Sequence, residues 1–314
     1  MTASAPRAVD IAFQAHRGLL WNLCYRMTGV AADADDLVQE TFVRALDRPP
    51  ADVATDLRPW LTRVAVNLAR DHLRARRRRG WPGPWLPSPI ETAEAEASPA
   101  YEPPSTEGRY DLLESCTFAF LLALEALTPQ QRAVLLLRDV FDYSVADTAA
   151  ALDLHEANVK VTHHRARRRM AEYDRTRRPP THALQETTRH TLERFLTALT
   201  RGDGRDIEAL LATGVRALSD GGGEFHAARK PVIGRARVAL LYRRLTELAG
   251  ARARVEIRMV NALPALVVDF GVLKPGYPPR GVIRVDVDDQ GLVHGVHSVL
   301  ATRKLTNVRF ASMG

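Results

Sequence analysis

The organisation of this chain follows from one stretch, Thr128–Tyr173, which reads TPQQRAVLLLRDVFDYSVADTAAALDLHEANVKVTHHRARRRMAEY. It opens with a capping box at Thr128–Gln131 that has proline in the first helical position. A second capping box at Ser144–Asp147 opens a short alanine-rich helix. A third helix runs from about Glu156 and is strongly basic. A short helix, a tight turn and a basic helix predict a helix-turn-helix, whose last helix enters the major groove of DNA.

The basic helix has an apolar side and other sides that carry polar and basic residues. Val159, Ala166 and Met170 fall on one side and are expected to pack on the two preceding helices. The residues that can read base edges or grip phosphates are Asn158, Lys160, Thr162, Arg165 and Arg168. The alternative is a solvated surface helix, which is the usual meaning of an arginine run. The two capped helices in front of it favour DNA binding.

At these residues the sequence resembles the promoter-reading C-terminal region of bacterial sigma factors of the extracytoplasmic-function (ECF) class. The matching pieces are Leu127–Pro129, Arg132–Val134, Arg138, Tyr143–Ser144, Ala149–Leu152 and Val159–Arg167. The resemblance implies that the basic helix reads the −35 promoter element. Two positions depart from the family pattern: His155 stands where a small cap is common, and His163 where leucine is common. A histidine cap is expected to weaken the start of the helix.

Composition points to a nucleic-acid partner. The chain has 314 residues, enough for two or three domains, and a net charge of +7 that favours nucleic acid over a membrane. We expect no signal peptide in the N-terminal MTASAPRAVD and no membrane span, and therefore a cytoplasmic protein. Cys24 and Cys116 are expected to be buried thiols rather than a disulfide or a metal site. No metal and no cofactor is expected.

The first expected domain covers residues 8–80. One helix spans Phe13–Met27, and a second is expected to begin at the N-cap residue Asp33. The apolar residues of this second helix fall on one side, namely Val38, Phe42, Ala45 and Leu46. The opposite side carries Asp36, Gln39 and Glu40. Such a side is either a solvated face or a docking face for a basic partner, and helical geometry alone does not separate the two.

The string Asp36–Phe42 resembles the polymerase-binding segment of sigma region 2. In that family the segment grips the clamp helices of the largest subunit of the core enzyme. The resemblance implies this role for Asp36, Gln39 and Glu40.

A third helix opens at Pro59. Its expected apolar stripe is Trp60, Leu61, Val64, Ala65 and Leu68. A second stripe, which can follow a phosphate backbone and hydrogen-bond a base, is Arg63, Asn67, Arg70 and Arg74. A plain surface helix is the alternative. The run Trp60–Asn67 is similar to the −10-reading helix of the family, which implies that Asn67 helps to hold an unstacked base; the preceding loop, residues 47–58, shapes the pocket for that base in the family.

Residues 81–108 form an expected linker, without Lys or Arg and rich in Pro and Glu. It is expected to be extended or disordered, serving solubility or tracking a positive channel of the polymerase. The patch Trp81–Pro87 is too apolar for a plain tether. It is expected to dock on another surface, and the third domain is one candidate. Its Trp85, Leu86 and Pro87 resemble a motif of ECF sigma factors that carry a C-terminal extension.

The two sigma-like domains, 8–80 and 109–178, are followed by a third over 181–314. Its expected helices are 184–201 and 235–249, with the segments 206–211 and 215–219 between them. Four expected strands follow, at 253–260, 264–270, 281–287 and 291–300. Helices followed by a curled antiparallel sheet predict an α+β domain. The order resembles SnoaL-like cone domains. The predicted fold class is therefore two all-α domains plus an α+β domain.

Two motifs of the third domain match sigma factors with this extension. One is the turn Asp220, Gly221, Gly222 and Gly223; the other, usually Asn-Pro-Asp-Lys-Leu, survives only as Lys304 and Leu305. The resemblance implies that these motifs tune the sigma domains. Asp220, Asp269 and His297 are the candidates for catalysis, but Asp220 is more simply a turn former and a lone His297 a structural residue. We expect no enzyme, and a ligand-binding or purely intramolecular regulatory module instead.

Three functions compete on the sequence. The leading one is an ECF sigma factor with core RNA polymerase and promoter DNA as partners, no membrane and no separate anti-sigma factor. The second is a self-sufficient helix-turn-helix regulator with a C-terminal sensor. The third is an isomerase-type enzyme fused to a DNA-binding unit, for which the discriminator is an apolar cavity that holds a carboxylate. A small-molecule ligand of the C-terminal domain stays open as a further partner.

Overall fold

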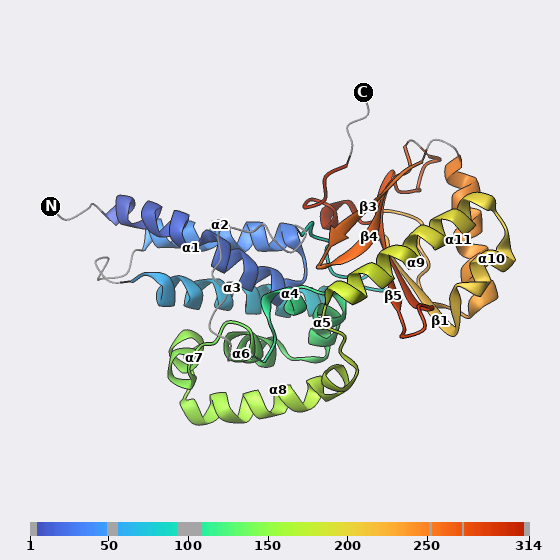
Figure 1. The fold of residues 1–314 in the computed structure, drawn as a ribbon. Helices are drawn as coiled ribbons and strands as arrows, with labels where there is room; N and C mark the ends of the chain where they lie inside the picture. The colour runs from blue at the N-terminus through green and yellow to red at the C-terminus, as the bar shows by residue number, and fades with distance from the viewer. Residues whose placement is uncertain (1–4, 49–55, 93–108, 251–252, 272, 311–314) are drawn as a thin grey trace. The chain divides into compact units, whose positions relative to one another are not determined.

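The structure is a computed structural model that describes residues 5–48, 56–92, 109–250, 253–271 and 273–310 (Figure 1). The chain divides into two compact units. Unit 1 combines Met1–Gly80 with Glu96–Arg178, and unit 2 combines Trp81–Ala95 with Pro179–Gly314. The first part of the expected linker thus groups with the C-terminal domain, while residues 93–108 lie outside the described residues.

Unit 1 is helical throughout its described part. The elements before the linker are α1 (Ala5–Thr28), α2 (Ala31–Asp47) and α3 (Arg58–Arg79). Those after it are α4 (Leu112–Ser115), α5 (Phe118–Ala123), η1 (Leu124–Ala126), α6 (Pro129–Asp139), α7 (Val145–Leu152) and α8 (Glu156–Thr176). From the second group, α6 and α7 pack on α3. The two expected sigma domains therefore form one unit.

The junction of α1 and α2 differs from the expectation. Gly29 ends α1 with a φ of 70°, and its N–H donates to the carbonyl of Tyr25 over 2.6 Å. The N-cap of α2 is Val30, so the N-cap predicted at Asp33 is wrong. The hydroxyl of Thr28 accepts from the Val30 N–H at 3.2 Å, which lets the second helix start at once. Asp33 instead lies buried in the first turn, 2.9 Å from a ring nitrogen of His72.

Packing of α2 and α3 follows their apolar sides with four exceptions. Leu46, expected inside, is 55% exposed, while Trp60, Val64 and Leu68 are only half-buried. The residues of α3 that are buried are Leu61, Thr62, Ala65, Val66, Ala69 and Leu73. This face is broader than predicted because α3 packs on α1 and α2 and also on α6 and α7.

Arginines join the two halves of unit 1. Arg132 of α6 is 1% exposed and donates to the carbonyl oxygens of Met27 (2.8 Å) and Leu124 (2.7 Å). Its guanidinium also lies 2.6 Å from Glu125, which binds Arg76 of α3 from the other side at 2.5 Å. A buried guanidinium needs such partners, so these bonds fix the two halves against each other.

Unit 2 is an α+β domain, as predicted. Its elements are α9 (His182–Arg201), α10 (Gly204–Ala209), β1 (Leu211–Asp220), β2 (Val232–Ile233), α11 (Arg235–Ala249), β3 (Arg254–Val260), β4 (Leu263–Asp269), β5 (Arg280–Val287), β6 (Val293–Val299) and η3 (Thr302–Lys304). The strands follow the order β2-β1-β6-β5-β4-β3. The structure differs from the expected antiparallel sheet in one place: β1 pairs with β6 in parallel, while the other strand pairs are antiparallel.

Two helices cover one face of this sheet. On this face α9 and α11 lie across the strands (Figure 1), and Phe195 and Tyr242 from these helices meet edge to face with centroids 5.7 Å apart. The described part of the linker is bound to the same unit: Ile90 exchanges hydrogen bonds with Asn261 at 3.0 and 2.9 Å, and Glu91 bridges to Val260. Over residues 81–92 the linker is therefore a packed part of the C-terminal domain.

Candidate functional site

The predicted helix-turn-helix is present as α6, α7 and α8. Both halves of the capping box at Thr128 and Gln131 are formed, and Ser144 caps α7 by accepting from the Asp147 N–H at 3.0 Å. Asp153, with a φ of 55°, closes α7 in the left-handed region and turns the chain into α8. His155 is the N-cap of α8 and makes no side-chain cap bond, which fits the expected weak start of this helix.

The recognition helix α8 turns its apolar side inward. Val159, Ala166 and Met170 are fully buried, as predicted. Asn158, Arg165 and Arg168 are exposed, and Thr162 is half-buried. Val161, which is 49% exposed, lies among them and can contact a thymine methyl group. Lys160 is also exposed. It lies seven residues, or about two helical turns, before Arg167, so these two residues share a side of α8 that differs from the side of Asn158.

Two basic residues of α8 have a structural task. Arg167 binds the buried carboxylate of Asp139 at 2.6 and 3.1 Å, and a ring nitrogen of His163 lies 2.9 Å from it. Burial by itself would raise the pKa of the Asp139 carboxyl, but the bonds from His163 and Arg167 outweigh burial and hold it below its usual range. His163, at a position where leucine is common, thus ties α8 to α6. Sequence reasoning missed this role because Asp139 lies 24 residues away.

The predicted −10 stripe lies along one side of α3. Asn67 accepts a hydrogen bond from Arg70 at 3.1 Å, which fixes the orientation of its side-chain amide. Arg74 binds Asp71 at 2.7 Å, and Arg63 lies 3.8 Å from Asp153 in the helix-turn-helix. The loop expected to shape a base pocket, residues 47–58, lies mostly outside the described residues.

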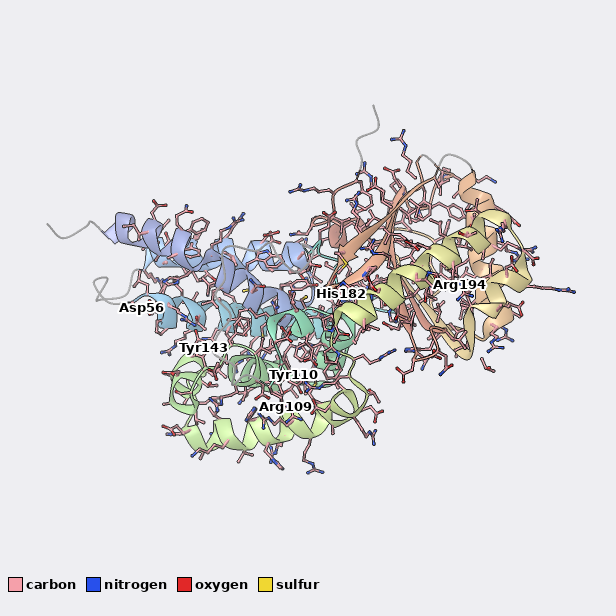
Figure 2. The ribbon with its side chains drawn as sticks, in the orientation of Figure 1. Asp56, Arg109, Tyr110, Tyr143, His182 and Arg194 are labelled. Carbon is pink, nitrogen blue, oxygen red and sulfur yellow. The ribbon has the colours of Figure 1, made fainter. Side chains whose placement is uncertain are left out.

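A cavity of about 490 Å³ separates the start of α3 from the helix-turn-helix. Asp56 and Trp60 line one side, and Tyr143 and Asp147 line the other; Asp56 and Tyr143 carry labels in Figure 2. The start of α3 and the α6–α7 part of the helix-turn-helix therefore border a common hollow.

The acidic side of α2 is open to a partner. Asp36, Gln39 and Glu40 are all exposed, and Glu40 binds Arg44 at 2.8 Å. Val43 and Leu46, 50% and 55% exposed, continue this side toward the end of the helix. The exposure of Leu46 that contradicts the packing prediction therefore adds apolar surface beside the acids.

The Gly-rich turn, the Trp-Leu-Pro patch and the Lys-Leu residues meet at one point in unit 2. Asp220, at the end of β1, is fully buried, and its carboxylate lies 2.6 Å from the Lys304 ammonium. The same carboxylate accepts from the indole N–H of Trp81 at 3.0 Å and from the backbone N–H of Leu86 at 2.8 Å. It also accepts from the Gly222 N–H at 3.1 Å, so the turn-forming role predicted for Asp220 is combined with an anchoring one.

Lys304 completes this cluster from the C-terminal side. It is 1% exposed, and its ammonium sits over the rings of Trp81 and Trp85, 4.3 and 4.5 Å from their centroids. It also donates to the carbonyl of Leu86. A buried ammonium requires a counter-charge and further acceptors, and here Asp220, one carbonyl and two indole faces supply them. Leu305 and Pro87 are buried beside it.

The glycines of the turn allow the close approach. A Cβ on Gly222, whose φ is 62°, would lie 2.7 Å from the Cβ of Ala301, and one on Gly223 would lie 3.0 Å from Pro82. A Cβ on Gly221 would lie 2.8 Å from the carbonyl oxygen of Phe225. The turn is therefore packed between the linker and the C-terminal segment. We name the group Trp81, Trp85, Leu86, Asp220 and Lys304 the linker clasp.

Comparisons with known proteins agree with this architecture. The family Sigma-70 region 2 matches residues 12–79, and Sigma-70, region 4 matches residues 117–170. The chain is 33% identical over 226 residues to the ECF RNA polymerase sigma factor SigJ of Mycobacterium tuberculosis, which covers 71% of this chain and 68% of that protein. This chain belongs to the ECF RNA polymerase sigma factor family.

Two further similarities support the assignment of this ECF sigma factor. It is 37% identical over 164 residues to SigG of the same organism, over 46% of this chain and 42% of that protein. The crystal structure of M. tuberculosis SigJ superposes with a TM-score of 0.68 at 27% identity, over 94% of this chain and 97% of that one. The likeness to SigJ thus includes the C-terminal sheet domain. Sigma factors bind core RNA polymerase and promoter DNA, and region 4 contributes their DNA-binding helix-turn-helix.

The three catalytic candidates of this sigma factor do not share a cavity. Asp220 is engaged in the linker clasp, and Asp269 lies 3.3 Å from Arg280. His297 lies on the face of β6 opposite to Ser298, which points to Tyr242 of α11, and it sits 3.5 Å from Asp286.

Cys24 and Cys116 are both buried, as expected, and burial raises the pKa of their thiols to about 12 and about 11. Among the described residues no group of three His, Cys, Asp or Glu side chains is placed to hold a metal ion. Within the same residues, every helix is too short or too polar to cross a membrane.

Proposed function

We propose that this ECF sigma factor is regulated in cis by its own C-terminal domain, which holds the linker between the two sigma regions. In this proposal α2 binds core RNA polymerase through Asp36, Gln39 and Glu40, α3 reads the −10 element, and α8 reads the −35 element. The C-terminal domain acts by binding rather than by catalysis. A separate anti-sigma factor is then not required.

The observation that carries this proposal is the linker clasp. The linker begins at Trp81, directly after Gly80 has ended α3, and Trp81 already donates to Asp220 of the C-terminal domain. The clasp therefore binds the chain two residues beyond the last residue of the helix that is proposed to read the −10 element. Lys304 must be present for Asp220 to be buried as an ion, so the C-terminal segment controls the grip on the linker.

Regulation through the clasp needs two states of the linker, one held and one released. Core polymerase shifts the balance between them only by its differential affinity for the two states. Release frees residues 81–92 to follow a path on the polymerase, whereas the held state fixes them against β1 and η3. Loss of the C-terminal segment and loss of the whole domain are therefore expected to act differently, because only the first leaves Asp220 next to the linker.

The test is transcription from one promoter by three proteins with the same core enzyme: the full chain, a truncation before Ala301 and a truncation near Pro180. We expect the three activities to differ, and Lys304→Met in the full chain to shift activity in the direction of the first truncation. Lys274→Met, at an exposed lysine of the same domain, is the matched control. Equal activity of all three proteins would remove the proposal of regulation in cis.

A further inference from the structure

We propose that the C-terminal domain binds a neutral, largely apolar small molecule in the cavity between α9, α11 and the strands β3 to β5. This site lies in unit 2, whereas the residues proposed to bind polymerase and promoter DNA lie in unit 1. It lies on the helix-covered face of the sheet, as shown by its contact with Leu199 of α9, Ala249 of α11 and Val268 of β4.

The first argument is size. The cavity measures about 420 Å³. Protein interiors are close-packed and seldom contain voids larger than a water molecule, whereas pockets for drug-sized ligands span roughly 300–1,000 Å³. The cavity is therefore large enough to hold a small organic molecule. Leu245, a large apolar side chain that lines it, is 36% exposed, so the cavity opens to solvent along α11.

The second argument is the chemistry of the wall. None of the described residues that line the cavity carries a charge. Its three hydroxyl side chains already have partners in the protein: Thr200 donates to the Leu196 carbonyl at 2.9 Å, Thr246 donates to the Tyr242 carbonyl at 3.0 Å, and the Tyr242 hydroxyl lies 2.8 Å from that of Ser298. Against these described side chains an ionic ligand would lose its hydration without compensation, which favours a neutral, apolar one.

The third argument separates binding from turnover. An isomerase-type site needs a carboxylate or histidine against its ligand. Asp220, Asp269 and His297 are all absent from the residues that line the cavity. Burial raises the pKa of the Tyr242 hydroxyl to about 12, so it stays a neutral hydrogen-bonding group at physiological pH. The cavity therefore offers shape and apolar contact without a general base.

A second, smaller cavity of about 80 Å³ shares the walls Leu245, Phe270 and Ile283 with the first. Beyond these walls it carries polar groups, among them Ser219 and His226, whose ring meets Tyr277 with centroids 5.4 Å apart. A ligand that fills the 420 Å³ cavity therefore contacts the shared wall of Leu245, Phe270 and Ile283.

The test uses two probes with one ring system on the full-length chain. N-phenyl-1-naphthylamine is neutral, and 8-anilino-1-naphthalenesulfonate adds one sulfonate to the same rings. We expect saturable fluorescence enhancement with the neutral probe, an affinity at least tenfold lower for the sulfonate, and a melting temperature that rises with the neutral probe.

Cavity variants decide the location. Ala249→Trp places an indole in the cavity and is expected to weaken binding of the neutral probe at least tenfold; Ala249→Leu, which disturbs the fold less, is expected to weaken it by a smaller factor. Leu240→Trp adds the same indole at an exposed position of α11 and should leave binding unchanged. The proposal is overturned by absence of saturable binding to the wild-type chain, by equal affinity for both probes, or by equal affinity of wild type and both Ala249 variants.

Discussion

The hydroxyl groups of Thr62 and Tyr143 lie 3.0 Å apart, and they join the helix proposed to read the −10 element to the helix-turn-helix. Both belong to unit 1, where the salt bridge between Arg63 and Asp153 crosses the same boundary at 3.8 Å. Each of these helices is proposed to contact a different promoter element. The contact is therefore expected to open when both elements are bound at once.

Removal of this hydroxyl pair should loosen unit 1. In the variant Thr62→Val with Tyr143→Phe, the ratio of open to closed molecules should rise about two- to tenfold, because a typical hydrogen bond contributes about 0.5–1.5 kcal/mol. Spin labels on Asp71→Cys and Glu172→Cys, both exposed, report the distance between α3 and α8, since the native Cys24 and Cys116 are buried. A distance distribution identical to that of the labelled parent would contradict this prediction.

Lys304→Met should destabilise the C-terminal domain by about 3–5 kcal/mol, because it leaves the fully buried Asp220 without its counter-charge. The double variant Asp220→Asn with Lys304→Met should recover part of this loss, since it removes both charges. Urea unfolding followed by tryptophan fluorescence measures both effects through Trp81 and Trp85. Lys274→Met serves as the surface control, and a loss no larger than in this control would argue against the buried ion pair.

Asp36→Arg with Glu40→Arg should abolish binding to core RNA polymerase while the protein stays folded. Both side chains are exposed on α2, so the change reverses the charge of the proposed docking side without disturbing the core. Co-purification with core polymerase is the measurement, and circular dichroism checks the fold. Glu172→Arg, at an exposed acid of α8, is the matched control. Unchanged co-purification would reject this docking side.

Asn67→Ala should impair opening of the promoter more than its initial binding. The Asn67 amide is held by Arg70, and three arginines on the same side of α3 remain to hold the phosphate backbone. Permanganate reactivity of thymines near the −10 element reports opening, and filter binding reports the initial complex. Equal thymine reactivity of variant and parent would count against a base-holding role.

Arg165→Ala should weaken binding to a matched −35 element by about 1–3 kcal/mol if the side chain contacts a base edge. The comparison with a scrambled element is decisive, since a phosphate contact would be lost equally on both sequences. Arg175→Ala, at an exposed arginine close to the end of α8, is the control. No loss on either sequence would reject the assignment of this side of α8 to the groove.

Local signals in the sequence predicted the elements well. The capping box of α6 and the bounds of α11 agree with the structure, because caps and apolar periodicity act within a few residues. The buried side of α8 follows for the same reason. The exposed side chains that we assign to polymerase and DNA remain predictions, since the structure shows only that they are accessible.

What the sequence did not predict depends on residues far apart in the chain. The bond from Leu86 to Asp220 spans 134 positions, and that from Lys304 to Leu86 spans 218. The motifs were recognised one by one through family resemblance, but no local rule indicates that they meet. The parallel pairing of β1 with β6 and the broad buried face of α3 have the same origin, since both arise from contacts between distant elements.

The residues of the linker clasp are synthesised at widely separated times. Trp85 leaves the ribosome about 220 residues before Lys304, which at 5–20 residues per second is a delay of roughly 10–40 s. During that interval both sigma regions of unit 1 have been made, while Asp220 has no ammonium to bury against and the linker has no anchor. Under the proposed regulation in cis, a nascent chain passes through a period in which the helices assigned to the promoter exist and their restraint does not. We therefore expect translation rate and premature termination to influence how much unrestrained sigma factor a cell contains.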